Sequence, residues 1–428
     1  MRLSEHLPAD ASLATSRAMN PMAQAMRGSL ILGIAGDVRE MVAAGAQVCN
    51  LTVGDFDARQ FPIPRPLRDA TVAAIDGAQT NYPPAEGLPE LRKAVARWYG
   101  DNLGLDVGPD WVIIASGARP VMYSTYRLVL EPGDDLVYAV PSWNNSYYAE
   151  LCGAREVPVV TRVEDNFFPT AAMLEAPLSR ARLFTLNSPL NPTGTVIDPA
   201  QLADIARLVV DENRRRTREG RPALMWMWDQ VYWQLTFGAA RHAHPAQLVP
   251  EVAPWVITID AISKAFAATG LRVGWAVLPP YLAERMKAFI GHVGAWAPRP
   301  EQVATAAWLG DRAGMASFLE GFRAGLSERL ELLHRGLGRL DVEHLNPQGA
   351  LYLSVRFPLF GRPGVDGRPM ATNEDVRRWL LARAGIAVVP FQAFDLASDT
   401  GWFRMSVGAV TPASLEAGLA RLGDALGA

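Results

Sequence analysis

Short apolar segments that end abruptly in polar or glycine-rich residues restrict this chain to few folds. Such segments occupy residues 111–115, 135–140, 183–186, 224–228 and 256–259. Continuous apolar runs of this length are typical of strands buried on both faces, as in parallel sheets. Amphipathic helical stretches lie between them, for example residues 201–213. The alternation predicts an α/β protein with helices on both sides of a sheet.

The polar segments that follow these runs come at the carboxyl ends of the predicted strands. They are residues 116–120, 141–145, 187–194 and 229–232. In open α/β sheets, ligands bind beyond the carboxyl ends of the strands. We therefore expect these segments to meet at one ligand site. The C-terminal part differs, because a long helical region over 311–340 precedes short apolar runs at 350–355, 386–389 and 402–407. This pattern predicts a smaller α+β unit.

Lysine is rare in this chain, with three residues against 38 arginines. Lys93 and Lys287 lie in mixed-charge segments typical of solvated helix faces, whereas Lys264 follows the largely apolar segment 256–263. A buried ammonium is costly unless it is paired, neutralised or covalently used. Lys264 is therefore either a lysine that forms a Schiff base or one whose amine reaches solvent from a strand end.

The composition excludes several classes of protein. The net charge of −3 and the pI near 6.1 argue against a surface for nucleic acid or anionic membrane. Two cysteines, Cys49 and Cys152, are too few for a disulfide framework or a metal cluster, so we predict a reducing compartment and no metal site. No apolar run approaches the roughly 20 residues of a membrane span, and the N-terminus lacks the order of a signal peptide. We predict a cytoplasmic protein.

Eight short motifs follow one another along the chain between residues 51 and 407. They are Tyr-x-x-x-x-Gly-x-x-x-Leu-Arg at 82–92, Ser-Gly-Ala-Arg at 116–119, Pro-Ser-Trp at 141–143, Asn-Pro-Thr-Gly at 191–194, Asp-Gln-Val-Tyr at 229–232, Ser-Lys at 263–264, Gly-Leu-Arg-Val-Gly-Trp at 270–275 and Phe-Arg-Met-Ser at 403–406. In this order they resemble the pyridoxal-phosphate (PLP) aminotransferases of fold type I, class I/II, the aspartate and aromatic aminotransferase group. Any one motif alone is weak evidence, since Asn-Pro-Thr-Gly by itself is a good turn.

The resemblance implies a large domain with a mostly parallel seven-stranded sheet flanked by helices, and a smaller α+β domain. The division that we predict is an N-terminal arm with part of the small domain over 1–60, a large PLP-binding domain over 61–320 and a small domain over 321–428. The resemblance also implies a homodimer with shared active sites.

The resemblance assigns roles around the cofactor ring. Lys264 would form the aldimine with PLP and move a proton between the substrate Cα and the cofactor. Asp229 would face the pyridine nitrogen and keep it protonated; the alternative is a helix cap. Tyr232 and Asn191 would bind the phenolate oxygen, or else be satisfied core and turn residues. Trp143 would stack on the ring.

The phosphate site implied by the resemblance lies at the start of a helix. Its residues would be Gly117, Ala118, Arg119, Arg272 and, reaching across from the neighbouring subunit, Tyr82. Many relatives have a serine or threonine three residues before the lysine, and here that position is Ala261. Ser263 either compensates for it or is only structural.

The resemblance assigns Arg404 to the substrate α-carboxylate, through a two-pronged ion pair. Asn191 and Gly54 would also lie near the substrate, although Gly54 is equally explained as a turn glycine. Arg299 would either bind a distal carboxylate or pair with Glu301 on the surface. Trp233 and Trp296 are candidates for an apolar substrate pocket.

The function that the resemblance implies is transfer of an amino group between an L-amino acid (aspartate, aromatic or similar) and a 2-oxo acid such as 2-oxoglutarate. The same residues serve other PLP reactions, so a β-lyase, a decarboxylase or an oxidase is the alternative. A regulator with a PLP-type fold is disfavoured, because no basic helix-turn-helix segment precedes Leu51. We expect no nucleic-acid or membrane partner.

Overall fold

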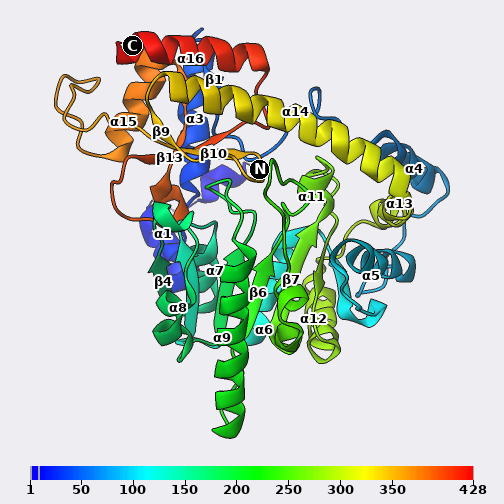
Figure 1. The fold of residues 1–428 in the computed structure, drawn as a ribbon. Coiled ribbons are helices and arrows are strands. Elements are labelled where there is room, and N and C mark those ends of the chain that lie inside the picture. The colour runs from blue at the N-terminus through cyan, green and yellow to red at the C-terminus, as the bar shows by residue number, and fades with distance from the viewer. Residues whose placement is uncertain (1, 8–9, 428) are drawn as a thin grey trace.

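The computed structural model describes residues 2–7 and 10–427, and its centre is a seven-stranded sheet (Figure 1). The strands, in spatial order, are β2 (Val112–Ala115), β8 (Gly274–Val277), β7 (Val256–Ala261), β6 (Met225–Asp229), β5 (Leu183–Asn187), β3 (Asp135–Val140) and β4 (Arg155–Val160). Strand β8 is antiparallel to β2 and β7, and the pairs from β7 to β4 are parallel. The predicted mostly parallel seven-stranded sheet is confirmed.

The burial of each strand explains whether its sequence forms a continuous apolar run. Every residue of β2, β3, β7 and β8 is buried, because helices cover both faces of the sheet. Strand β4 lies at the edge and is largely exposed, so its sequence includes Arg155 and Glu156 and forms no apolar run.

Helices surround this sheet, and α9 extends well beyond the body of the molecule (Figure 1). They are α4 (Arg65–Asp76), α5 (Pro89–Leu103), α6 (Ala118–Val129), α7 (Asn145–Cys152), α8 (Ala171–Leu178), α9 (Pro199–Arg218), α10 (Pro245–Leu248), α11 (Ile262–Ala265), α12 (Pro280–Val293) and α13 (Arg299–Gly310). Short 3₁₀ helices also occur among the described residues, namely η1 (Leu3–His6), η2 (Pro109–Trp111), η3 (Val163–Asp165), η4 (Pro250–Trp255) and η6 (Phe391–Phe394).

A second, antiparallel sheet is built from the C-terminal part. It has the order β12 (Val389–Pro390), β13 (Trp402–Ser406), β10 (Tyr352–Arg356) and β9 (Glu343–His344). Four helical segments accompany it, namely α14 (Arg312–Arg339), α15 (Asn373–Trp379), the π-helical turn η5 (Leu380–Ala384) and α16 (Pro412–Leu426). The predicted smaller α+β unit is confirmed.

The N-terminal segment joins this second unit. After α1 (Ala11–Ala18), α2 (Pro21–Ala25) and α3 (Leu30–Ala43), strand β1 (Cys49–Asn50) pairs in parallel with β11 (Ile386–Ala387). The domain boundaries near residues 60 and 320 stay a prediction. Within the described residues, no helix is long and apolar enough to cross a membrane.

Candidate active site

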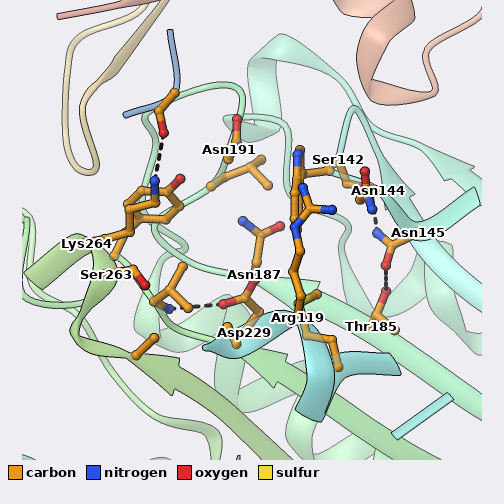
Figure 2. A pocket seen from close by; sticks show the side chains of 18 of the residues that line it. Arg119, Ser142, Asn144, Asn145, Thr185, Asn187, Asn191, Asp229, Ser263 and Lys264 are labelled. Carbon is orange, nitrogen blue, oxygen red and sulfur yellow. Dashed lines mark hydrogen bonds between the residues drawn. The ribbon is translucent and has the colours of Figure 1, made fainter. Parts of the chain in front are cut away.

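A cavity of ≈ 560 Å³ lies where the carboxyl ends of the large-sheet strands face the small sheet. Asn187 and Asp229 are the last residues of β5 and β6 and pair in register. Tyr352 and Arg404 line the cavity from the strands β10 and β13 of the small sheet. The expectation that the strand-end segments meet at one site agrees with this arrangement (Figure 2).

The amine of Lys264 points into this cavity from the short helix α11 (Figure 2). Its Nζ donates a hydrogen bond to the Gly54 carbonyl at 2.7 Å. Burial, which disfavours the charged form, lowers the pKa of Lys264 to about 8, although the nearby Asp55 carboxylate opposes the shift. Burial therefore makes the neutral amine easier to reach than it is for a lysine in solvent.

Asp229 ends strand β6, the neighbour of β7 in the large sheet (Figure 2). Its Oδ1 accepts a hydrogen bond from the Val231 N–H at 3.1 Å. Burial raises the pKa of this carboxyl from 3.8 to about 6, and the backbone hydrogen bond opposes that rise. A cation placed beside Asp229 would stabilise its charged form.

Two tyrosines and an arginine–asparagine pair close the side nearest the small sheet. The hydroxyls of Tyr232 and Tyr352 lie 2.7 Å apart. Arg404 is 2% exposed and donates to Asn191 Oδ1 at 3.0 Å and to the Thr52 carbonyl at 2.7 Å. The Asn191 oxygen is thereby occupied, which leaves its amide N–H groups as donors.

The start of α6 and Arg272 form a narrow, positively charged recess. Gly117 has φ +86°, and a Cβ there would lie 2.2 Å from Arg272 Nη2, so no side chain fits at this position. Arg272 donates from Nη1 to the Thr269 carbonyl at 2.7 Å and from Nη2 to the Ser116 carbonyl at 3.2 Å. The first N–H groups of a helix have no intrahelical acceptor, so this recess suits an anion.

Arg119 and Trp143 face the same cavity from the other side of that recess. The Arg119 guanidinium lies 4.5 Å from the centre of the Trp143 ring, a cation–π contact. Ala118, Ala261 and Ser263 also line the cavity, and Ala261 brings no hydroxyl to it. Apart from Gly117 and Tyr82, the residues predicted around the ring and phosphate therefore line this cavity within one chain.

Gly117, Tyr82 and Arg299 do not line this cavity within one chain, and neither do the candidate pocket residues Trp233 and Trp296. Tyr82 is 81% exposed, and its ring meets that of Trp296 edge-on at 5.3 Å. Arg299 borders a separate depression, where its Nε donates to Gln79 Oε1 at 2.9 Å. This hydrogen bond goes to Gln79 and not to Glu301, the surface partner that the sequence offered as the alternative. The roles of Tyr82 and Arg299 stay predictions.

Sequence reasoning missed several cavity residues. Asn145 donates from Nδ2 to Ser142 Oγ at 2.9 Å and accepts from Thr185 Oγ1 at 3.0 Å, which ties the Trp143 loop to β5 (Figure 2). Tyr352 was treated only as part of a strand. Asn145 follows the Pro-Ser-Trp motif directly, so its position carried a signal, whereas nothing in the local sequence around Tyr352 did.

The fold and this arrangement of residues define an enzyme class, and sequence comparison gives the same result. The family described as "Aminotransferase class I and II" matches residues 46–422. The chain belongs to this family. It is therefore a transaminase that acts on amino acids, and the predicted resemblance is confirmed.

Named relatives agree with this assignment. The probable aspartate/prephenate aminotransferase of Thermus aquaticus is 29% identical, over 96% of this chain and 100% of that protein. A bifunctional aspartate aminotransferase and glutamate/aspartate-prephenate aminotransferase of Petunia hybrida is 30% identical, over 95% and 82%. Among solved structures, the Thermus thermophilus aspartate aminotransferase with maleate has a TM-score of 0.85 at 26% identity, over 96% and 100%. The Rhizobium meliloti aspartate aminotransferase has 0.86 at 27%, over 96% and 98%.

Proposed function

We propose that this enzyme uses PLP to move an amino group between an L-amino acid and a 2-oxo acid such as 2-oxoglutarate. When bound, PLP supplies an aldehyde that bonds to amines and a ring that accepts electrons from the substrate Cα. The observation that carries the proposal is the presence, in one cavity, of the Lys264 amine and the buried Asp229 carboxylate.

The donor set of the cavity fits the polar groups of PLP. Arg272 and the first N–H groups of α6 suit the phosphate, and the missing side chain of Gly117 lets the Arg272 guanidinium lie against the start of that helix. Asp229 suits a protonated pyridine nitrogen, and Ser263 is placed to add a hydroxyl where Ala261 has none. Two further donors, the Tyr232 hydroxyl and the Asn191 amide, suit the ring oxygen.

Lys264 holds and moves the proton. Burial lowers the pKa of its Nζ and so makes the neutral amine, the form that can accept a proton from the substrate Cα, easier to reach. The Gly54 carbonyl, which accepts its hydrogen bond at 2.7 Å, holds the amine in the cavity. Trp143 is placed to cover the ring and exclude water from one face, and Asn145 holds the loop of Trp143 in position.

Arg404 would hold the α-carboxylate of the substrate. Its guanidinium is buried, its Nε has no partner among the described residues, and Asn191 fixes its orientation. A dicarboxylate substrate such as aspartate needs a second cation. Arg119 offers one inside the cavity of the same chain, whereas Arg299 would have to act on a neighbouring subunit. Relatives named for aspartate and prephenate support dicarboxylate and aromatic substrates.

A homodimer with shared sites and a cytoplasmic location complete the proposal. Tyr82 is exposed and lies outside its own cavity, which suits a residue that reaches the phosphate of a neighbouring subunit. Both cysteines, Cys49 and Cys152, are free thiols, in keeping with a reducing compartment.

The test is a half-reaction. Protein loaded with PLP is mixed with aspartate alone, without a 2-oxo acid. Transamination predicts one oxaloacetate per active site and loss of the visible absorption band, and then recovery of the band with 2-oxoglutarate. Continued product formation without an acceptor would contradict transamination and favour a lyase or decarboxylase.

The same assay separates the two candidate cations. If Arg119 binds the distal carboxylate, Arg119→Leu is expected to slow the half-reaction with aspartate more than the half-reaction with phenylalanine. Arg299→Leu is the matched variant. If only Arg299→Leu loses activity with aspartate and keeps it with phenylalanine, the distal carboxylate is bound by Arg299 of the neighbouring subunit instead.

A further inference from the structure

A pair of hydroxyls joins the two sheets at the cavity. Tyr232 follows strand β6 of the large sheet, and Tyr352 begins strand β10 of the small sheet. Their hydroxyls lie 2.7 Å apart, and their rings meet edge-on at 5.6 Å and 73°. Both side chains line the cavity, and Tyr352 is only 1% exposed. The proposed function assigns no role to Tyr352.

The number of protons limits what this pair can donate. Burial raises the pKa of both Tyr232 and Tyr352, so both hydroxyls keep their protons at neutral pH. A phenol has one proton to donate and lone pairs that accept. One of the two protons lies between the hydroxyls, and no other hydrogen bond is recorded for either of them within the described residues. The pair therefore has one proton left to donate into the cavity.

The direction of the pair follows once Tyr232 is assigned to the cofactor. Tyr232 can donate to the ring oxygen of PLP only if Tyr352 supplies the proton between the two hydroxyls. We propose that Tyr352 is a positioning residue that donates its hydroxyl proton to Tyr232, and thereby commits the proton of Tyr232 to the cofactor. This inference rests on the proposed function.

The ring of Tyr352 has a separate task, which is to support Arg404. The Arg404 guanidinium lies 4.6 Å from the centre of that ring. Two glycines make the position possible. A Cβ at Gly54 would lie 3.1 Å from the Tyr352 hydroxyl, and a Cβ at Gly194, where φ is +73°, would lie 2.0 Å from the Tyr352 carbonyl oxygen. The hydroxyl of Tyr352 thus hydrogen-bonds Tyr232, while its ring lies against the Arg404 guanidinium.

Two substitutions separate these tasks. Tyr352→Phe removes the hydroxyl and keeps the ring, and Tyr352→Leu removes both. The readout is a pH titration of the visible absorption band of the PLP-loaded protein. The acceptor is the ring oxygen of PLP, and a hydrogen bond from Tyr232 would favour its charged form. Weakening that hydrogen bond should therefore raise the apparent pKa at which the visible band changes. We expect Tyr352→Phe to raise the pH midpoint by roughly 0.3–1 unit.

Substrate binding provides the second readout. Tyr352→Phe is expected to leave the KM for the amino acid within about twofold of wild type, because the contact of the ring with Arg404 remains. Tyr352→Leu is expected to raise the KM by roughly 3- to 10-fold, because that contact is lost. Equal KM values for the two variants would overturn the assignment of the ring.

A double-mutant cycle distinguishes a relay from a general structural effect. In a Tyr232→Phe background, Tyr352→Phe should cause no further shift of the midpoint, because the acceptor of its proton is gone. Additive shifts would overturn the inference. Tyr138→Phe is the matched control, since Tyr138 is buried on β3, bonds Glu156 and does not line the cavity. It should titrate like wild type.

Failure of the inference is distinguishable from failure of the proposed function. A wild-type protein that binds PLP and shows the visible band, with a Tyr352→Phe variant that titrates at the wild-type midpoint, overturns the role of Tyr352 alone. A wild-type protein that develops no visible band with PLP overturns both.

Discussion

Replacing Asp229 with asparagine should stabilise the cofactor-free protein while it weakens cofactor binding. Burial raises the pKa of Asp229 from 3.8 to about 6, so the folded protein holds this carboxylate charged at a cost. At about 1.4 kcal/mol for each pKa unit, that cost is at most ~3 kcal/mol above pH 7. Asparagine carries no charge, and its Oδ1 keeps the hydrogen bond that Asp229 accepts from the Val231 N–H.

The pH dependence of the free energy of unfolding shows at which pH the variant should be the more stable protein. A carboxyl whose pKa is raised on folding binds more protons in the folded than in the unfolded state, so the free energy of unfolding falls as pH rises from about 4 to about 6. Asp229→Asn removes this loss. The variant should therefore match wild type near pH 4 and have the higher melting temperature at pH 7–8, as measured by calorimetry on cofactor-free protein.

The cofactor reverses the order. A protonated pyridine nitrogen beside Asp229 would pair with the carboxylate, so PLP should raise the melting temperature of wild type more than that of Asp229→Asn. Equal melting temperatures for wild type and Asp229→Asn without PLP at pH 7–8 would refute the claim that a buried charge on Asp229 destabilises the cofactor-free protein. A variant that gains as much from PLP as wild type does would refute the pairing.

Three further predictions follow from the same geometry. Gly117→Ala forces a Cβ to within 2.2 Å of Arg272 Nη2 at a φ of +86°, and a strain of roughly 1–3 kcal/mol should weaken PLP binding by about 5- to 100-fold in calorimetric titration. Arg404→Lys loses the planar two-pronged pair, and should raise the steady-state KM for the amino acid by roughly 10- to 100-fold. Burial raises the pKa of Cys49 and Cys152, so both thiols should react slowly with a disulfide reagent when folded and fast in denaturant.

Each of these has a control. Gly220→Ala also places an alanine at positive φ, +64°, but no atom lies within 4 Å of the added Cβ, so it should leave PLP binding unchanged. For Arg404→Lys, an unchanged KM with a reduced kcat would contradict the assignment of Arg404 to binding of the substrate α-carboxylate. Fast labelling of either cysteine in the folded protein would contradict its burial.

The sequence predicted the parts of the fold that depend on burial of neighbouring residues. The interior strands β3, β5, β6 and β7 form continuous apolar runs because the sheet is covered on both faces. Edge strand β4 was not predicted, since exposure allows it charged residues. Within the site, Asp229 and Asn191 were predictable as candidates because Asp229 ends strand β6 and Asn191 lies in the turn that follows β5.

What the sequence did not reveal depends on contacts between distant segments. Tyr352 matters because β10 brings it against Tyr232, 120 residues earlier in the chain, and no local pattern encodes that approach. The direction of a long side chain is equally hidden. Arg119 was predicted for its place in the phosphate loop, yet its guanidinium stacks on Trp143 inside the cavity.

The most direct test of the central claim is to locate the lysine that bonds to PLP. The chain has only three lysines, so reduction of the PLP-loaded protein with borohydride and peptide mass mapping gives an unambiguous result. We predict one phosphopyridoxyl group per chain, on Lys264, and none in Lys264→Ala. A group on Lys93 or Lys287 instead, or no retained group at all, would contradict the account.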